Sequence, residues 1–250
     1  MAASDLEPVM DSDTPFPCRP IGRIHSCFRE KFGIPRQPGL APDAQALLEL
    51  LPPYASRETL NGLEGFSHVW VVFVFHQALR GTWRPTVRPP RLGGNRRIGV
   101  FASRAPFRPN PIGLSACVLQ GIEQRDGRPC LRLGGVDLLD GTPVLDIKPY
   151  LPYSDAIPEA RAGYAQAAPP AALRVAFDPA AEQAIAAAEA RHPGLRRLIA
   201  QVLAADPRPA WQTGAAGRRR FGMHLWDYDL QWTVAGDVIR VTGLLALDPG

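Results

Sequence analysis

The hydrophobic positions of the chain fall mostly into short runs, which predict strands. Residues 69–75 form an unbroken apolar run rich in β-branched and aromatic side chains, which predicts a buried strand. Residues 47–51 fit either a strand or a helical turn. Further short strands are predicted at residues 20–26, 98–102, 112–119, 129–134 and 144–148. Many short strands separated by Gly and Pro favour a barrel or sandwich over a doubly wound α/β sheet.

The C-terminal third has a different pattern. Asp178 followed by Pro179 predicts a helix start, and this helix extends to about Arg191. A second helix begins near Leu195, with apolar residues at the i, i+3, i+4, i+7 and i+8 positions. Residues 226–234 alternate between apolar and polar side chains and form a predicted hairpin with residues 238–244. A small α+β unit is therefore expected at the C-terminal end.

These patterns divide the chain into four parts. Residues 1–17 are expected to be a disordered acidic extension, residues 18–154 a β domain, residues 155–172 a linker or arm, and residues 173–250 the α+β domain. No apolar run approaches the roughly 20 residues of a membrane-spanning helix. Residues 1–17 contain four acidic residues, no basic residue and no signal-peptide core. We therefore expect a cytoplasmic protein.

Charge is unevenly distributed along the chain. Residues 65–122 contain no Asp or Glu, although the chain as a whole has 24. The same segment carries eight arginines: Arg80, Arg84, Arg88, Arg91, Arg96, Arg97, Arg104 and Arg108. With a net charge of +4 for the chain, this segment is +8 and the remainder −4. A preference for Arg over Lys does not explain the missing carboxylates, so an anionic partner such as a nucleic acid is indicated.

Several common catalytic and binding motifs are absent from the sequence. No two glycines are separated by a single residue, so a Rossmann-type G-x-G-x-x-G motif is missing, as are Walker A, H-E-x-x-H and G-x-S-x-G motifs. The four cysteines fit no zinc or redox spacing, and the five histidines lie far apart. No metal site is expected.

Candidate chemistry is concentrated in proline- and glycine-rich loops. Residues 36–39 place an Arg and an amide side chain in a rigid loop, and His76 and Gln77 follow the buried strand. Residues 83–95 combine arginines with a tryptophan and close-approach glycines, which suits contacts to phosphates and bases. Residues 137–150 bring three acids, a turn and a lysine together. Each signal alone also fits an ordinary surface loop.

Taken together, these segments resemble the TsaA-like family, also called TrmO. The resemblance is carried by PRQPG at residues 35–39, FVFHQ at 73–77 and DGTPV at 140–144. Residues 31–32, 62–64, 66–68, 83–95, 99–102, 107–113, 146–152, 164–166 and 206–210 also match. It extends over about residues 19–249, nearly the whole chain. Members of this family methylate N6 of threonylcarbamoyladenosine beside the anticodon of tRNA.

The resemblance implies a mainly β fold, in which a single-sheeted antiparallel β-barrel forms the catalytic domain and a small α+β domain follows it. It implies S-adenosyl-L-methionine as cofactor, tRNA as partner, and a homodimer with the cofactor near the subunit interface. The implied cofactor-binding residues are Arg36, Gln37, Pro38, His76, Gln77, Arg104, Leu114, Asp140, Gly141, Thr142 and Pro143. The C-terminal domain is expected to help hold tRNA.

The implied reaction needs a group that removes the proton of a weakly nucleophilic nitrogen. The candidates are Asp137, Asp140, Asp146 and His76, and the sequence does not choose among them. The carboxylate of the modified base needs a cationic partner, and the candidates for it are Arg84, Arg88, Arg91 and Lys148. Two alternatives stay open: a tRNA-binding module without catalysis, and a methyltransferase for another substrate.

Overall fold

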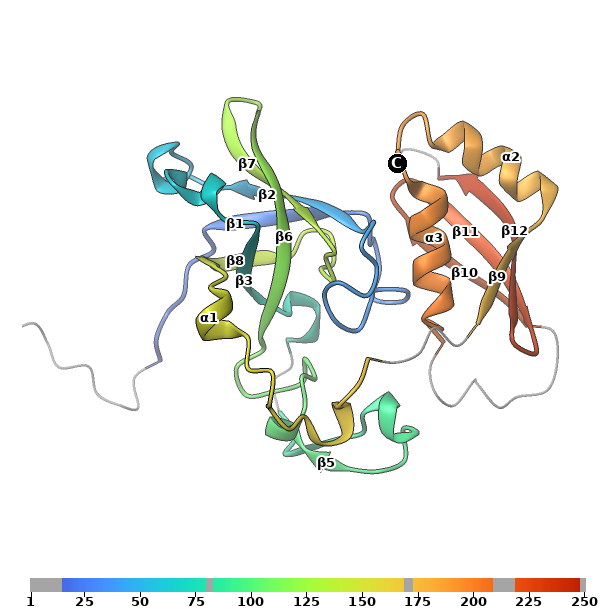
Figure 1. The fold of residues 1–250 in the computed structure, drawn as a ribbon, viewed down its shortest axis with the longest axis horizontal. Coiled ribbons are helices and arrows are strands. Elements are labelled where there is room, and N and C mark those ends of the chain that lie inside the picture. The colour runs from blue at the N-terminus through green and yellow to red at the C-terminus, as the bar shows by residue number, and fades with distance from the viewer. Residues whose placement is uncertain (1–14, 80–82, 169–172, 209–218, 248–250) are drawn as a thin grey trace, which may run out of the picture.

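The computed structural model describes residues 15–79, 83–168, 173–208 and 219–247. An N-terminal β domain and a C-terminal α+β domain lie side by side, and a small lobe extends from the first (Figure 1). The predicted mainly β class with a C-terminal sheet domain is therefore confirmed. Within these ranges, every helix is too short or too polar to cross a membrane. Most of the predicted acidic extension, residues 1–14, lies outside the described residues.

Six antiparallel strands form the N-terminal domain. Their hydrogen-bonded order is β1-β2-β7-β6-β3-β8, and β8 pairs back onto β1, so that the pairing closes into a barrel. The strands are β1 (Gly22–Ser26), β2 (Gln45–Leu50), β3 (His68–Val74), β6 (Ile112–Arg125), β7 (Arg128–Gly134) and β8 (Pro143–Pro149). The ambiguous apolar run at residues 47–51 thus belongs to a strand, because β1 and β7 pair with it on both sides.

Side chains alternate between the interior and exterior of this barrel. Val69, Val71 and Phe73 of β3 are buried, and the residues between them are more exposed. Ile24 and Leu48 contribute fully buried side chains from the neighbouring strands. Because the strands are antiparallel, β1, β3 and β7 end where β2, β6 and β8 begin. We call this end of the barrel, with the loops that join there, the loop end.

The small lobe consists mainly of turns. Its two short strands, β4 (Thr86–Val87) and β5 (Ile98–Gly99), pair with each other. A strand was predicted over residues 98–102, but the chain turns into a 3₁₀ helix at Val100–Ala102, where the Ser103 hydroxyl and N–H both donate to the Val100 carbonyl. The other 3₁₀ helices are Glu58–Leu60, Leu63–Gly65, His76–Ala78, Pro90–Leu92 and Gly163–Ala165. After α1 (Pro152–Asp155), residues 156–168, here called the connecting segment, pass beside this lobe (Figure 1).

The C-terminal domain is a four-stranded sheet with the order β10-β11-β12-β9. Its strands are β9 (Arg174–Phe177), β10 (Arg219–Leu225), β11 (Tyr228–Ala235) and β12 (Val238–Ala246), and β9 is parallel to β12. Helices α2 (Pro179–Ala188) and α3 (Leu195–Ala204) pack against it. The predicted hairpin is present, although its first strand begins at Tyr228, two residues later than expected. The first helix ends three residues earlier than expected.

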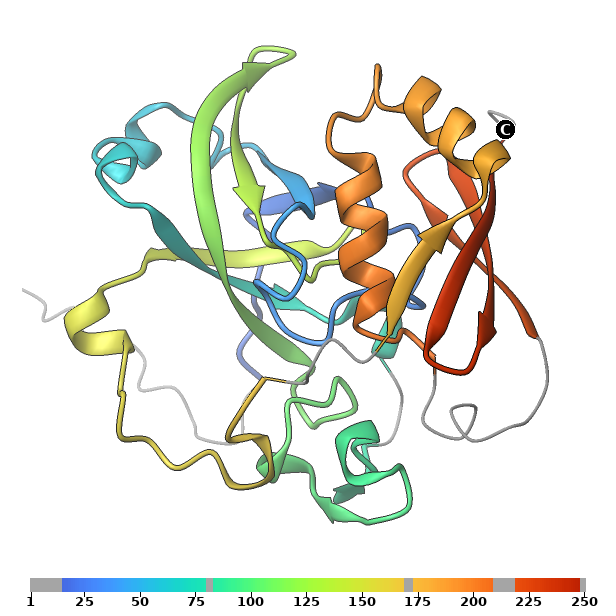
Figure 2. The same cartoon turned by 45° about the vertical axis from the view of Figure 1, so that its right-hand side comes forward.

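The two domains share a continuous hydrophobic core. A β-bridge pairs Phe28 with Leu225, and the Trp226 N–H donates to the Cys27 carbonyl at 2.8 Å. Residues 27–44, here called the β1–β2 loop, pass between the barrel and α3, as a turn of the view by 45° shows (Figure 2). A segment that carries predicted site residues therefore lies at the boundary of the domains.

Candidate functional site

The β1–β2 loop places predicted site residues at the loop end of the barrel. The side-chain amide oxygen of Gln37 accepts a hydrogen bond from the Arg104 guanidinium at 2.6 Å. This contact joins two predicted cofactor-binding residues that are 67 positions apart in the sequence. Arg36 and Arg104 are not paired with carboxylates in any ion pair of the described residues. The loop therefore brings the Gln37 amide and the Arg36 guanidinium to the part of the structure where Arg104 lies.

A close backbone approach joins this loop to the segment between β7 and β8. The Gly39 N–H donates to the Gly135 carbonyl at 2.8 Å. Both glycines have positive φ angles, +78° and +65°, and a Cβ on Gly135 would lie 3.4 Å from the Gly39 backbone. A larger residue at position 135 would be strained and crowded, so the two glycines allow the loops to meet.

Asp137 lies just beyond this contact, in a mostly buried position. Its carboxylate accepts a hydrogen bond from the Ser115 hydroxyl at 2.6 Å, and the Ser115 side chain is itself buried on the inner face of β6. Burial raises the pKa of Asp137 from 3.8 to about 6, and the Ser115 hydrogen bond and the positive charge of Arg104 oppose this shift. A carboxylate with such a pKa is both ionised and basic near neutral pH.

The turn of residues 140–143 fixes the end of β1 through its side chains. Asp140 accepts hydrogen bonds from the Ser26 N–H at 2.9 Å and from Arg29 at 2.5 Å. The buried Thr142 hydroxyl donates to the Leu139 carbonyl at 2.7 Å. Gly141, with a φ of +77°, would have no atom within 4 Å of an added Cβ, so this part of the turn faces open space. The N–H groups of Asp140, Gly141 and Thr142 already donate to the carbonyls of Phe28, Ile24 and Leu139, so the turn can offer carbonyl groups, but not these N–H groups, to a ligand.

His76 and Gln77 lie at the same end, where β3 passes into a 3₁₀ helix. The Lys31 ammonium of the β1–β2 loop donates to the Gln77 carbonyl at 2.5 Å. Burial lowers the pKa of His76, and the positive charges of Lys31 and Arg23 lower it further. His76 is therefore neutral near pH 7. Its ring is half-buried, whereas Gln77 is exposed.

Three other predicted residues, Leu114, Asp146 and Lys148, lie on the outer face of the barrel. Val72 pairs with Leu114 on one side and with Asp146 on the other, so all three lie in one row across the strands. The Leu114 side chain is 52% exposed and points away from the neighbouring Ser115. Lys148 forms an ion pair with Asp146 at 2.9 Å. The structure thus separates Asp146 and Lys148 from Asp137.

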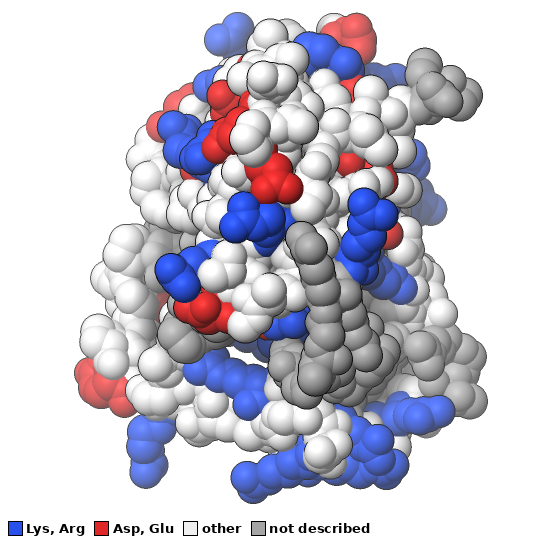
Figure 3. All heavy atoms as spheres, turned by 90° about the vertical axis from the view of Figure 1, so that its right-hand side faces the viewer, with Lys and Arg blue, Asp and Glu red and all other residues white. Residues whose placement is uncertain are grey.

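The predicted substrate-binding arginines belong to the small lobe. Arg84, Arg88 and Arg91 are all exposed, and Arg91 donates to the Ala167 carbonyl of the connecting segment. From the side of the C-terminal domain, Lys and Arg predominate along the lower rim of the surface, at the level of this lobe (Figure 3). The predicted substrate-binding arginines therefore lie together on an exposed cationic lobe.

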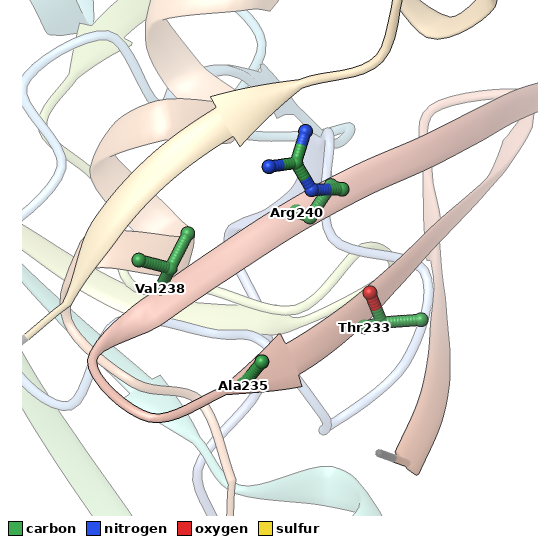
Figure 4. A pocket seen from close by; sticks show the side chains of 4 residues that line it. All are labelled: Thr233, Ala235, Val238 and Arg240. Atoms are coloured by element: carbon green, nitrogen blue, oxygen red, sulfur yellow. The ribbon is translucent and has the colours of Figure 1, made fainter.

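Two of the hollows in the structure differ in their relation to the group formed by Gln37, Arg104 and Asp137. One, of about 410 Å³, lies at the β11–β12 hairpin and is lined by Thr233, Ala235, Val238 and Arg240 (Figure 4). It contains none of the predicted site residues. The other, of about 200 Å³, lies between the β1–β2 loop and the end of α3, and Arg36 contributes to its lining.

The sequence reasoning missed two residues of this region. Ser115, the partner of Asp137, is a polar residue at an inward position of an otherwise apolar strand, and this pattern was a usable signal. Arg29, the partner of Asp140, lies in a loop with no comparable signal.

Comparison with known proteins identifies the family. A family model described as the tRNA-methyltransferase O N-terminal domain matches residues 23–156, and one described as the TrmO C-terminal domain matches residues 170–247. The chain belongs to the TrmO family. The predicted resemblance is thereby confirmed. Both domains of the fold fall within the matched residues.

Individual TrmO-family relatives resemble the chain over nearly its full length. The tRNA (adenine(37)-N6)-methyltransferase of Escherichia coli strain K12 is 48% identical over 92% of this chain and 96% of its own. A putative S-adenosylmethionine-dependent methyltransferase, RcsF, of Pseudomonas aeruginosa is 55% identical over 89% and 94%. A crystal structure of TrmO from Pseudomonas aeruginosa superposes with a TM-score of 0.77 at 46% identity, covering 93% of this chain and 99% of that one.

Proposed function

We propose that the chain methylates N6 of threonylcarbamoyladenosine beside the anticodon, with threonine tRNA as its substrate and the cytoplasm as its location. As a TrmO-family protein, it is an S-adenosylmethionine-dependent tRNA (adenine-37-N6) methyltransferase. The proposal concerns the modified base, the tRNA and the residues that act. It is carried by the linked arrangement of Gln37, Arg104, Asp137 and Ser115 at the loop end of the barrel.

The side chains at the loop end fit the chemical groups of the cofactor. S-adenosylmethionine supplies a transferable methyl group on a sulfonium, and it also carries a carboxylate, an ammonium group and an adenosine. The guanidinium groups of Arg36 and Arg104 suit the carboxylate, and the Gln37 and Gln77 amides suit polar atoms of the adenosine. The turn around Gly141 adds backbone carbonyl groups, which suit the ammonium group. We place the cofactor against these residues.

Asp137 is our choice among the four candidate bases. Asp140 holds the end of β1 through two hydrogen bonds, and Asp146 is paired with Lys148 on the outer face. His76 is neutral, but it is surrounded by the positive charges of Lys31 and Arg23, which oppose its taking up a proton. Asp137 alone combines a raised pKa with a position beside Arg104. Its carboxylate would accept the N6 proton as the new bond to carbon forms.

Binding the carboxylate of the threonylcarbamoyl group requires a cationic side chain that is not already paired within the protein. Lys148 is already paired with Asp146, and Arg91 donates to the connecting segment. Arg84 and Arg88 are exposed in a segment that contains no acidic residue. We therefore assign these two arginines to the modified base or its neighbouring phosphates.

An exposed apolar stripe supports the proposed homodimer. Ile112, Leu114 and Val118 of β6 point outward with exposed fractions of 44%, 52% and 39%. Trp70 and Val72 of β3 continue the same face. A row of outward apolar residues on neighbouring strands is typical of a protein interface. Since Leu114 is also an implied cofactor residue, this face would bring a second subunit near the cofactor.

The choice of base is tested by comparing two isosteric variants. Asp137→Asn should lower kcat by at least about 100-fold, because a positioned base typically contributes this much. Asp146→Asn is the matched control and should stay within about threefold of the wild type, since Asp146 is an exposed partner of Lys148. Methyl transfer would be measured under single-turnover conditions with saturating tRNA and cofactor. A full rate for Asp137→Asn would remove Asp137 from the mechanism.

A further inference from the structure

The C-terminal domain contacts the base of the β1–β2 loop through α3. The side-chain amide of Gln201 forms two hydrogen bonds to Asp43. Its oxygen accepts from the Asp43 backbone N–H at 3.0 Å, and its nitrogen donates to the Asp43 carboxylate at 2.6 Å. Arg197 donates to the same carboxylate at 2.9 and 3.2 Å. The backbone and side chain of one loop residue are thus both fixed by a single helix.

A second contact lies in the middle of the loop. Phe32 stacks on Trp232 of β11, with ring centroids 5.9 Å apart and planes within 4° of parallel. The adjoining Gly33 has a φ of +88°, and an added Cβ would lie 2.3 Å from the sulfur of Met223 in β10. The loop backbone therefore packs directly onto the C-terminal sheet.

The third contact reaches the part of the loop assigned to the cofactor. The Arg36 guanidinium lies 3.5 Å from the Arg208 carbonyl oxygen. The Arg208 side chain is itself held by Asp206 through hydrogen bonds of 2.7 and 2.8 Å. The 200 Å³ hollow lies between the loop and the end of α3, and Phe32, Arg36 and Gln201 all contribute to its lining.

We propose that Gln201 and Arg197 of the C-terminal domain are positioning residues for the cofactor-binding loop. The inference rests on the proposed function, because it takes residues 36–38 to bind S-adenosylmethionine. Apart from the Phe28 bridge, the loop has no regular secondary structure. A flexible binding loop weakens affinity in proportion to the time it spends outside the competent conformation. Contacts from α3 on one side, and Arg104 and Gly135 on the other, would limit that loss.

The test compares two sets of contacts made by side chains of α3, one with the β1–β2 loop and one within the C-terminal domain. The double variant Arg197→Ala/Gln201→Ala removes the side chains that hold Asp43. The control Arg196→Ala removes a guanidinium that donates to Glu182 of α2 at 2.7, 3.0 and 3.2 Å, a similar ion pair within the C-terminal domain. The dissociation constant for S-adenosylmethionine would be measured by isothermal titration calorimetry without tRNA. The KM for the cofactor and kcat would be measured with tRNA.

We expect the double variant to weaken cofactor binding about tenfold, if the competent loop population falls to about one tenth. KM for the cofactor should rise by a similar factor while kcat at saturation stays within about twofold. Arg196→Ala should change neither constant by more than about twofold. Wild-type affinity in the folded double variant, or equal losses in both variants, would overturn the inference.

A further variant covers the case in which the double variant does not fold. Asp43→Asn removes the charge that Arg197 contacts and keeps a side chain that Gln201 can reach. It should weaken cofactor binding by a few-fold, and unchanged binding would again overturn the inference. If the wild-type protein itself did not bind S-adenosylmethionine, the proposed function would fail as well, so the two failures are distinguishable.

Discussion

At the scale of single residues, the function depends on how the surroundings of similar acids differ. Asp140 and Asp137 are three positions apart, yet Asp140 is tied to Ser26 of β1 and Arg29 of the β1–β2 loop, whereas Asp137 lies in a mostly buried position beside Ser115. Burial gives Asp137 a pKa of about 6. The same carboxyl group type thereby serves as a structural anchor in one place and as a candidate base in the other.

A raised pKa makes a prediction about stability and pH. The protonated form of Asp137 is favoured in the folded state, so its stabilising effect is complete below pH 3.8 and is lost as the pH rises through about 6. Asp137→Asn should therefore increase the free energy of unfolding at pH 8 by up to about 2 kcal/mol. Urea unfolding at pH 8 would measure this change. A loss of stability in Asp137→Asn would show that the ionised carboxylate is well accommodated.

The pH profile of catalysis follows from the same group. If Asp137 accepts a proton, kcat/KM for tRNA should rise with pH and level off above an apparent pKa near 6. Asp146→Asn should keep that profile. An unchanged rate between pH 5 and pH 8 would contradict the assignment.

At the scale of elements, the sequence pattern predicted the strands that are favoured by their own side chains, and it missed a strand that depends on a distant partner. The run at residues 69–75 gave β3 (His68–Val74) to within one residue, because β-branched and aromatic side chains favour a strand on their own. β9 (Arg174–Phe177) was missed because it is four residues long and is defined by parallel pairing with β12, more than 60 positions later. Asp137 remained one of four candidates because its surroundings include residues distant in sequence, such as Ser115, which is 22 positions away.

The outer face of β6 carries the prediction for oligomeric state. Ile112→Asp should convert the proposed homodimer to a monomer, because it places a charge in the exposed apolar stripe that would form the interface. Leu245→Asp is the matched control, since Leu245 of β12 is an exposed apolar residue (55%) outside this stripe. Sedimentation equilibrium would distinguish the two. A dimer that persists in Ile112→Asp would place the interface elsewhere.

At the scale of the whole molecule, the C-terminal domain packs against the loop that carries part of the proposed cofactor site. Sequence patterns treat residues 173–250 as a separate α+β unit, and they are silent on the contacts that Asp43, Phe32 and Arg36 make with it. These contacts join residues that are far apart in sequence, so no local pattern reports them. The C-terminal domain is therefore not only joined to the barrel by the connecting segment. It also contacts the loop of the proposed cofactor site.

The cationic lobe makes a prediction about binding to tRNA. Arg84→Glu/Arg88→Glu should weaken tRNA binding and reduce the slope of log K against log salt by roughly 1.5 to 2, if each arginine contacts one phosphate. Arg57→Glu, at an exposed position just before the 3₁₀ helix Glu58–Leu60 and outside the small lobe, is the single-charge control. Filter binding over a range of salt concentrations would measure both. An unchanged slope in the double variant would exclude the lobe from the tRNA interface.

The central claim concerns the modified base, and one methyl-transfer assay tests it most directly. Labelled S-adenosylmethionine would be supplied with two threonine tRNA pools that differ only in the threonylcarbamoyl group on the adenosine beside the anticodon. We predict that label enters only the modified pool and is recovered on N6 of the modified nucleoside. Label entering both pools equally, or neither pool although the cofactor binds, would contradict the proposed substrate.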